Sequence, residues 1–474
     1  MRVLFASAEA YPFAMTGGLA DVAGALPKAL RNRRVGCRVI MPLYGCITKE
    51  HRAEMKFLKN ITVPVAWRNQ YCGIFEAKVG RVTYYLIDNE YYFKRPSLYG
   101  YLDDAERFTF FSRAVLEVLK HIDSKPDIIH CNDWQTAMIP VFKTLNYGAD
   151  PFYCNMKTLF TIHNIQYQGQ YGSDIIRDVL GLPEGTEHYV EYGDCVNLMK
   201  GAIECADYVS TVSPTYAKEI LTEEYSHGLH GILREREWKL GGIINGIDVD
   251  VYNPETDPMI YKNFSLSDMG GKAINKAKLQ DELGLPKRED VPLFGIVTRL
   301  VSHKGVDLIK CVMEDMLKSD IQFVILGSGE REFEDFFHYV AEKYPDKVSL
   351  TTGFIPSLAH KIYAGADLFL MPSKSEPCGL AQMVALRYGT IPIVRETGGL
   401  KDTITDSGLG EGNGFTFSLY NAHEMAHCVW RAAEGFKDKE GWNVLVTRAM
   451  NCDNSWGNSA AEYIGLYNKI LGNQ

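Results

Sequence analysis

Short apolar runs alternate with helical patterns along most of this chain, and this alternation limits the possible folds more than any other feature. Runs that are apolar on both faces are typical of strands buried in a parallel sheet, because helices cover each face of such a sheet. Helical patterns fill the gaps between the runs, as crossover connections between parallel strands require. We therefore predict the α/β class. The runs that indicate strands span residues 3–6, 38–42, 127–131, 157–163, 207–213, 293–297, 322–327 and 367–371.

The alternation stops near residue 240 and begins again at Leu293, and the stretch between them is rich in turn residues. We predict a hinge near residues 240–245. Two doubly wound domains would then face a cleft that holds a ligand, which is a favoured place for small-molecule sites. The predicted domains are residues 1–242 and residues 243–454.

Two segments extend this plan for the first domain. Alternating apolar and polar residues between 63 and 92 predict an antiparallel addition to the first sheet. The last helical pattern, within residues 455–474, is expected to pack back on the first domain.

Composition excludes several classes of function. The chain has 474 residues and a formal net charge of −9, which argues against general nucleic-acid binding because that needs a basic surface. No apolar run approaches the roughly 20 residues that cross a bilayer, so we expect no membrane partner. The 11 cysteines show no metal-binding spacing, and we expect no metal or other cofactor. Cys131, Cys205 and Cys311 lie among apolar residues and are expected to be reduced core thiols in a cytoplasmic protein.

One carboxylate, Glu376, lies in a proline–glycine turn directly after the predicted strand at 367–371. The carboxyl ends of parallel strands face the ligand crevice of an open sheet. The backbone amides of Cys378, Gly379 and Leu380 would point into the same space, where they could hold hydroxyls or phosphate oxygens. A glutamate in a turn can also be a solvated surface group. The second glycine turn, after the strand at 391–394, favours a ligand site.

Two cations, Arg299 and Lys304, lie in the loop after the strand at 293–297. Arginine offers a bidentate contact and lysine a point charge, so the pair could clamp a diphosphate. Two cations on a loop can equally be solvated. Their place at a strand's carboxyl end favours the anion site.

Three loops of the first half carry similar signals. Gly17 and Gly18 follow the first strand and allow close approach of a ligand to a helix start, although a plain turn would look the same. Asp133 and Trp134 offer a carboxylate and an indole face to a sugar. His163 also ends a buried strand, where a structural role remains the alternative.

Together these segments resemble the bacterial glycogen synthase (starch synthase) family, nearly from end to end. The resemblance rests on motifs that occur in order and at the family's spacing. They include Thr16-Gly-Gly-Leu-Ala-Asp-Val, His163-Asn-Ile-Gln-Tyr-Gln-Gly, Ile244-Asn-Gly-Ile-Asp248, Arg299-Leu-Val-Ser-His-Lys-Gly, Glu376-Pro-Cys-Gly-Leu380 and Thr397-Gly-Gly-Leu-Lys-Asp.

The resemblance implies a GT-B fold, with two Rossmann-like doubly wound domains facing a deep interdomain cleft. It implies a retaining glycosyltransferase that adds glucose from ADP-glucose to the non-reducing end of an α-1,4-glucan such as glycogen, without a metal. The implied catalytic residues are Glu376, Arg299, Lys304 and His163. The implied substrate-binding residues are Met15, Gly17, Gly18, Asp21, Asp133, Trp134, Asn164, Asn245, Phe354, Cys378, Gly379 and Leu380.

Within that set the resemblance implies separate roles. Arg299 and Lys304 would hold the diphosphate, and Glu376 would contact the donor glucose. His163 and Asn245 would also hold the donor glucose, whereas Asp133, Trp134 and Asn164 would line the acceptor side. Phe354 falls where the family stacks an aromatic ring on the adenine.

The chain departs from the family pattern at Met15, where the family has lysine. Losing a cation near the donor phosphates would cost about 2–4 kcal/mol in the transition state, or roughly 30- to 1000-fold in rate. Ala105, Ser375 and Ala381 also replace a usual glycine, aromatic residue and threonine. A catalytically weak or inactive glucan-binding homologue is therefore the alternative function, and a sucrose-forming GT-B enzyme is a third.

Overall fold

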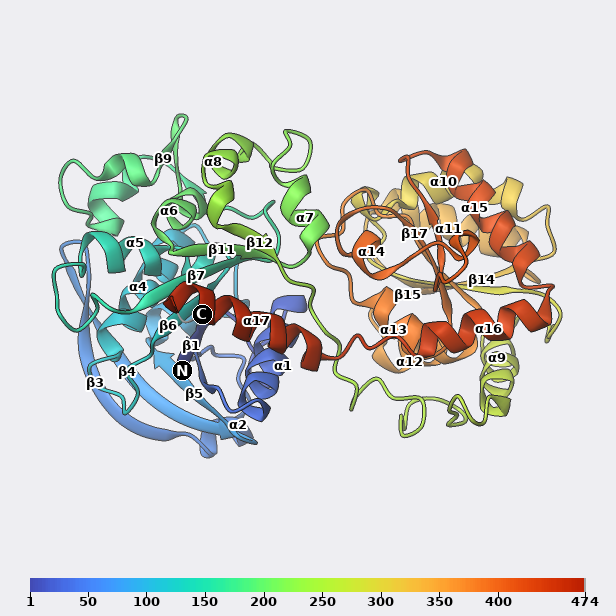
Figure 1. Cartoon of the computed structure of the whole chain (residues 1–474), viewed down its shortest axis with the longest axis horizontal. Helices are drawn as coiled ribbons and strands as arrows, with labels where there is room; N and C mark the ends of the chain where they lie inside the picture. The colour runs from blue at the N-terminus through green and yellow to red at the C-terminus, as the bar shows by residue number, and fades with distance from the viewer. Residues whose placement is uncertain (473–474) are drawn as a thin grey trace. The chain divides into compact units, whose positions relative to one another are not determined.

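The computed structural model of the chain describes residues 1–472, apart from the side chain of residue 409. The last two residues of the segment expected to form the final helix lie outside this part. The chain divides into two compact units, each described separately below (Figure 1). The first unit contains Met1–Val212, Ala217–Ile243 and the segment from Trp456 onward. The second contains Ser213–Tyr216 and Ile244–Ser455.

The first unit is built on a nine-stranded sheet in the order β12-β11-β7-β6-β1-β2-β5-β4-β3. From β12 to β5 every neighbouring pair is parallel. The chain leaves β1 for β2 on one side and later returns to β6 on the other, so the order reverses at β1. The strands are β1 (Arg2–Ala6), β2 (Gly36–Pro42), β3 (Lys56–Val65), β4 (Arg68–Val79), β5 (Val82–Asp88), β6 (Ile128–Asn132), β7 (Lys157–Ile162), β11 (Tyr208–Thr211) and β12 (Leu240–Gly242).

The antiparallel addition predicted for residues 63–92 is confirmed. Strands β3 and β4 pair antiparallel through a tight turn, and β4 pairs antiparallel with β5. The ribbon begins earlier than the sequence indicated, at Lys56, because the first half of β3 is largely exposed and lacks a buried apolar face. A separate small sheet joins β8 (Gln170–Tyr171), β10 (Cys195–Asn197) and β9 (Glu191–Tyr192).

Helices of the first unit follow its parallel strands, as the alternation in the sequence indicates. The helix α4 is buried along nearly its whole length, which explains its run of phenylalanines. The helices are α1 (Gly18–Asn32), α2 (Lys49–Ala53), α3 (Glu90–Phe93), α4 (Asp104–Val118), α5 (Met138–Leu145), α6 (Leu198–Cys205), α8 (His230–Glu235) and α17 (Trp456–Leu471), and α7 (Pro214–Glu219) begins within the second unit.

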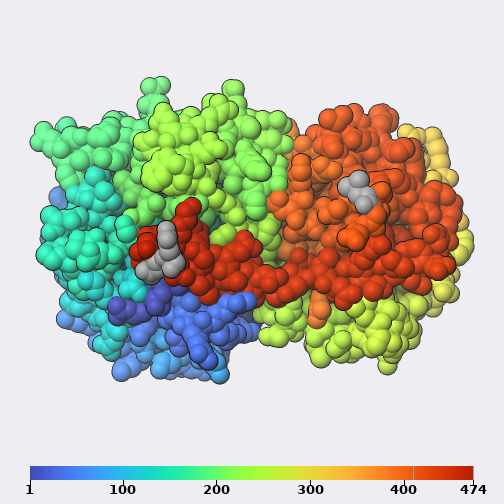
Figure 2. All heavy atoms as spheres, in the orientation of Figure 1, coloured from blue at the N-terminus to red at the C-terminus, as the bar shows by residue number. Residues whose placement is uncertain are grey.

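The C-terminal helix α17 packs against α1 in the first unit (Figures 1 and 2). Its Tyr467 hydroxyl lies 2.8 Å from Nδ1 of His130 on β6. Nε2 of His130 lies 2.6 Å from the Thr161 hydroxyl on β7, which lies 2.7 Å from the Ser210 hydroxyl on β11. Burial holds the pKa of His130 well below its usual value, so the ring is neutral. A buried polar chain thus joins three strands to the last helix.

The second unit has a six-stranded sheet in the order β15-β14-β13-β16-β17-β18, parallel throughout. Its order reverses between β13 and β16. The strands are β13 (Leu293–Val297), β14 (Gln322–Gly327), β15 (Val348–Thr352), β16 (Leu368–Met371), β17 (Ile391–Arg395) and β18 (Phe415–Phe417). The helices are α9 (Gly270–Glu282), α10 (Val306–Met316), α11 (Arg331–Lys343), α12 (Pro356–Gly365), α13 (Ala381–Arg387), α14 (Gly398–Thr403), α15 (Ala422–Gly435) and α16 (Lys439–Met450).

The expectation of a buried thiol is wrong for Cys311, which is exposed on α10, and only partly right for Cys205, which is half-buried. The core face of α10 is formed by Leu308, Ile309 and Val312. Position 311 falls on the opposite side of a helix with 3.6 residues per turn. Cys131, on a central strand, is buried as expected.

Within residues 1–472 we find no helix that combines the length and the apolar character needed to span a membrane.

Replacing Tyr467 by phenylalanine should destabilise the first unit by about 1–3 kcal/mol, because one ring nitrogen of the buried His130 would lose its partner. Urea denaturation followed by tryptophan fluorescence measures this change. The control is Tyr91→Phe, at a tyrosine that is 69% exposed, and it should be nearly neutral. Equal stabilities for the two variants would contradict the role assigned to the buried chain.

Candidate functional site

The predicted cations and the predicted glutamate of the second unit lie on loops of two neighbouring strands. Strand β13 pairs with β16 in the sheet, and the order reverses between them. The loop after β13 carries Arg299 and Lys304, and the loop after β16 carries Glu376. Carboxyl ends of strands at such a reversal form the ligand crevice of open α/β sheets.

Lys304 and Glu376 form a bidentate ion pair. The Lys304 ammonium donates to Oε1 and Oε2 of Glu376 at 2.9 and 2.7 Å. The Ser373 hydroxyl donates to the same carboxylate at 2.9 Å. The Glu376 side chain is only 9% exposed and that of Lys304 is 20% exposed. The pair therefore places a cation and a carboxylate side by side in a partly dehydrated crevice, where charges act strongly on a ligand.

Glycines hold the Glu376 loop against the next loop of the sheet. A Cβ atom on Gly398 would lie 1.9 Å from the carbonyl oxygen of Glu376, and one on Gly399 would lie 2.0 Å from that of Cys378. The Gly399 amide donates to the Glu376 carbonyl at 3.2 Å. Gly379 has a φ of +73°, which favours glycine. The second glycine turn thus supports the position of Glu376.

The helix that follows also fastens this loop. The Gln382 side chain is fully buried on α13, and its Nε2 donates to the carbonyls of Cys378 and Gly379 at 3.1 Å each. Leu380 precedes the first residue of α13. The sequence reasoning missed Gln382 and Ser373, although both lie within the segment that pointed to the site.

Asn245 lies beside the same loop. Its backbone makes a hydrogen bond with the Cys378 thiol, whose pKa burial raises to about 12. The side chain is 5% exposed, and no described residue bonds to its Oδ1. A buried acceptor without a partner costs free energy, so this atom suits a ligand hydroxyl or amine.

Arg299 and Phe354 are not part of this buried cluster. Arg299 is exposed, and its Nη2 lies 3.5 Å from Nε2 of His303, one residue before Lys304. Desolvation, together with the charges of Lys304 and Arg299, lowers the pKa of His303. Phe354 is 86% exposed on the loop after β15. Their roles stay predictions.

The glycine loop of the first unit is open above its backbone. Cβ atoms added to Gly17 or Gly18 would meet nothing within 4 Å, and neither residue has a positive φ. The folded chain itself therefore does not require glycine there, which suits a ligand that approaches the backbone closely. Met15 is 53% exposed, and Asp21 is exposed on the first turn of α1.

The buried Glu9 holds this loop in place and was missed by the sequence reasoning. Its carboxylate accepts from the hydroxyl of Thr16 at 2.9 Å and from the backbone amide of the same residue. Burial is the main cause that raises the pKa of Glu9. Only its position after the first strand could have signalled it.

Asp133 and His163 are joined at the ends of β6 and β7. The Asp133 carboxylate accepts from the His163 amide at 2.7 Å. Asp133 has a φ of +58°, a conformation that costs a residue with a side chain about 1–3 kcal/mol and is often stored at functional sites. Desolvation raises the pKa of the Asp133 carboxyl to about 7. The hydrogen bonds from the backbone amides of His163 and Asn164 act in the opposite direction and lower it.

The His163 ring is neutral and has a fixed orientation. Burial lowers its pKa to about 3. Asn132 donates its amide to the carbonyls of Ala6 and His130, so its Oδ1 must accept from Nε2 of His163, 2.9 Å away. Nδ1 is then an acceptor that no described residue engages. The sequence drew attention to Asp133 and Trp134 but not to their neighbour Asn132, so its role was missed.

Trp134 has a tight fit within the first unit. Its indole packs edge-on against Phe108, with ring centroids 5.2 Å apart. A Cβ on Gly169 would lie 2.7 Å from the Trp134 ring. Asn164 is half-buried and forms a turn with its own side chain, which accepts from the amide of Gln166.

The described residues contain no cluster of three or more His, Cys, Asp or Glu side chains that could hold a metal ion.

Comparisons with known proteins agree with this geometry. Residues 2–235 match the starch synthase catalytic domain family, and residues 279–439 match the glycosyl transferases group 1 family. The glycogen synthase of Desulforamulus reducens is 51% identical over 479 residues, which cover 100% of this chain and 99% of that protein. The chain belongs to the glycogen synthase family. The glycogen synthase of Geobacillus stearothermophilus is 50% identical over 475 residues, 99% of this chain and 98% of that protein.

Solved structures give the family's fold. The catalytic domain of starch synthase IV from Arabidopsis thaliana, bound to ADP and acarbose, superimposes with a TM-score of 0.90 at 37% identity, and covers 99% of both chains. A sucrose-phosphate synthase from Thermosynechococcus elongatus shares the fold at a TM-score of 0.61 and 16% identity, over all of both chains. The predicted GT-B fold and the membership of this family are confirmed.

The glycines allow a test that separates packing from ligand contact. Gly399→Ala should lower stability by more than about 2 kcal/mol, since its Cβ would overlap the Cys378 carbonyl. Gly17→Ala has open space and should change stability by less than about 0.5 kcal/mol. The Gly17 variant should nevertheless bind nucleotide sugar more weakly. Thermal melting and calorimetric titration measure both, and an unchanged affinity would contradict close approach at Gly17.

The half-buried His163 predicts how stability depends on pH. Between its unfolded pKa near 6.5 and its folded pKa of about 3, only the unfolded chain takes up the proton. Acid therefore costs stability in this range, about 2 kcal/mol between pH 7 and pH 5. In His163→Gln this part of the decline should disappear. Urea titrations at both pH values measure it, and parallel pH profiles for the two proteins would refute the assignment.

Proposed function

We propose that this chain is a glycogen synthase that transfers glucose from ADP-glucose to the non-reducing end of an α-1,4-glucan, with retention of configuration. Matches to glycogen synthases over its full length support this function. The single observation that carries it at the site is the bidentate Lys304–Glu376 pair on neighbouring strand loops. Breaking a bond between glucose and a diphosphate creates negative charge on the leaving group and positive charge on the sugar. The pair provides one group for each.

In the proposed mechanism, Lys304 and Arg299 neutralise the departing diphosphate. The Arg299 guanidinium is exposed and free to form bidentate contacts with phosphate, whereas Lys304 acts as a point charge. Glu376 stabilises the positive charge that develops at the anomeric carbon. Glu376 is the sole carboxylate of this buried cluster among the described residues, so attack from the face of the leaving group explains retention better than a covalent intermediate.

Contacts to the sugar are proposed for several neutral groups. Nδ1 of His163 can accept a hydroxyl of the donor glucose, and so can Oδ1 of Asn245. The amides of Cys378, Gly379 and Leu380 are proposed to bind sugar hydroxyls and phosphate. For the acceptor side we propose a group of polar and aromatic residues of the first unit, namely Asp133, Trp134 and Asn164.

The choice of ADP as the nucleotide is the finer part of this proposal. Arabidopsis starch synthase IV was solved with ADP bound. In this chain the exposed ring of Phe354 is available for stacking on adenine. Release of nucleotide from ADP-glucose and from UDP-glucose, each with and without glycogen, would decide the preference.

Removing either member of the ion pair tests the mechanism. Lys304→Met and Glu376→Gln should each lower kcat by roughly 30- to 1000-fold, which corresponds to about 2–4 kcal/mol of lost transition-state stabilisation. The control Glu282→Gln breaks the comparable pair of Lys361 and Glu282 on the surface and should leave kcat unchanged. Nucleotide release from ADP-glucose with glycogen measures the rate, and full activity in both site variants would refute the mechanism.

Met15→Lys belongs in the same experiment, because it restores the cation that the family pattern has at this exposed position. Its expected effect is a rate at least tenfold higher. Absence of transfer both in the natural protein and in Met15→Lys, with glycogen binding retained, would support the glucan-binding homologue instead.

A further inference from the structure

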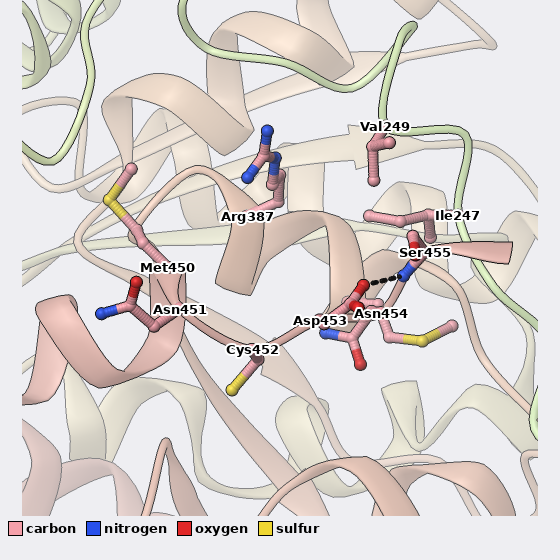
Figure 3. A pocket seen from close by; sticks show the side chains of 10 residues that line it. Ile247, Val249, Arg387, Met450, Asn451, Cys452, Asp453, Asn454 and Ser455 are labelled. Atoms are coloured by element: carbon pink, nitrogen blue, oxygen red, sulfur yellow. Dashed lines mark hydrogen bonds between the residues drawn. The ribbon is translucent and has the colours of Figure 1, made fainter. Parts of the chain in front are cut away.

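A cavity of about 350 Å³ lies within the second unit, at the C-terminal end of α13. Figure 3 shows Arg387 projecting from the end of this helix, with Met450 on one side and Ile247 and Val249 on the other. We call this space the Arg387 cavity. Its remaining lining residues are Met383, Asn451, Cys452, Asp453, Asn454 and Ser455.

Arg387 has an unusual environment for a half-buried cation. No described residue forms a hydrogen bond or an ion pair with its guanidinium, and its Nε is fully shielded from water. Arg431, which is also half-buried in this unit, pairs with Asp406. The C-terminal end of α13 offers Arg387 a favourable dipole, but a dipole does not give the shielded Nε–H an acceptor. A guanidinium in such a place suits a bound oxyanion.

The other walls define the rest of the ligand. Asn451, Asn454 and Ser455 supply amide and hydroxyl groups on one side, whereas Met383 and Met450 supply apolar surface. The Asp453 carboxylate on the polar side accepts from the Ser455 amide at 3.0 Å. This combination suits a small molecule with one phosphate or carboxylate group and several hydroxyls. The volume is within the usual range for small-ligand pockets.

Two segments connect the Arg387 cavity with the proposed active site. Helix α13 begins directly after the loop of Cys378, Gly379 and Leu380, and Arg387 is its last residue. At 1.5 Å per residue, this helix separates the two places by only about 10 Å. Ile247 lies two residues after Asn245, whose buried Oδ1 has no partner among the described residues. A ligand in the cavity would touch both segments without touching Lys304 or Glu376.

We propose that the Arg387 cavity binds a small hydroxylated oxyanion, with Arg387 as its charge partner, and that occupancy changes the rate of glucosyl transfer. The effect on the transfer rate rests on the proposed function. The binding of the oxyanion does not rest on it, since binding can be measured independently of transfer.

The test uses the full chain with glycerol 2-phosphate and gluconate as charged probes and glycerol as the neutral control. A bound ligand raises the melting temperature in proportion to RT ln(1 + [L]/Kd). At least one charged probe should stabilise the natural protein, and calorimetric titration should give a Kd at least tenfold weaker in Arg387→Gln. The two probes separate phosphate from carboxylate recognition. Arg331→Gln, which removes a 92% exposed arginine of α11, should retain the natural affinity.

Any binding of the probes at Arg299 and Lys304 is common to every variant, so the difference due to Arg387 isolates the cavity. Arg387→Lys keeps the charge and should recover part of the affinity. Loss of binding in both Arg387→Gln and Arg387→Lys together with a lower melting temperature without probe would show a structural role and overturn the proposal. Equal affinities in Arg387→Gln and the natural protein would do so too. Binding without a change of at least twofold in transfer rate would overturn the regulatory half.

Discussion

The ion pair between Lys304 and Glu376 is the interaction on which the site of the second unit depends. Two opposite charges on different loops lie close together, because each satisfies the other in a crevice with little water. Removing one would leave the other partly buried and unpaired, which is costly. The two charges of the pair are also preorganised. In the proposed mechanism, a substrate with a diphosphate next to a sugar would meet a cation and a carboxylate already in position, so little reorganisation would be needed when charge develops.

Backbone contacts keep that pair in position. The loop of Glu376 lies so close to Gly398 and Gly399 that any side chain at these two positions would overlap carbonyls of the loop. The Gln382 side chain also holds this loop by a hydrogen bond to the Cys378 carbonyl. In the first unit the opposite holds, since the glycines at 17 and 18 face open space. Glycine is therefore accommodated for two different physical reasons in this protein. In the second unit glycine lets another part of the chain come close, whereas at positions 17 and 18 it leaves open space above the backbone.

The fold was largely predictable because strands apolar on both faces and glycine turns at their ends leave few alternatives to doubly wound α/β units. Lys304 and Glu376 could be expected near each other for the same reason, since their strands end at the same edge. What escaped prediction depended on long-range packing. Glu9 and Asn132 act through hydrogen bonds to Thr16 and His163 that no local pattern specifies. Cys311 looked buried by composition, yet the helical period turns it outward. Whether a loop cation such as Arg299 is exposed or paired is likewise set by partners that are distant in sequence.

The discontinuous first unit has a consequence for how the chain folds during synthesis. Helix α17 contributes Tyr467 to the buried chain of His130, Thr161 and Ser210, yet it is separated from those strands by the entire second unit. A ribosome therefore releases the second unit, a continuous segment apart from Ser213–Tyr216, before the first unit has all of its parts. Until α17 has been synthesised, the first unit leaves α1 uncovered where α17 will dock. This surface of α1 would be open to chaperones that hold nascent chains until α17 docks.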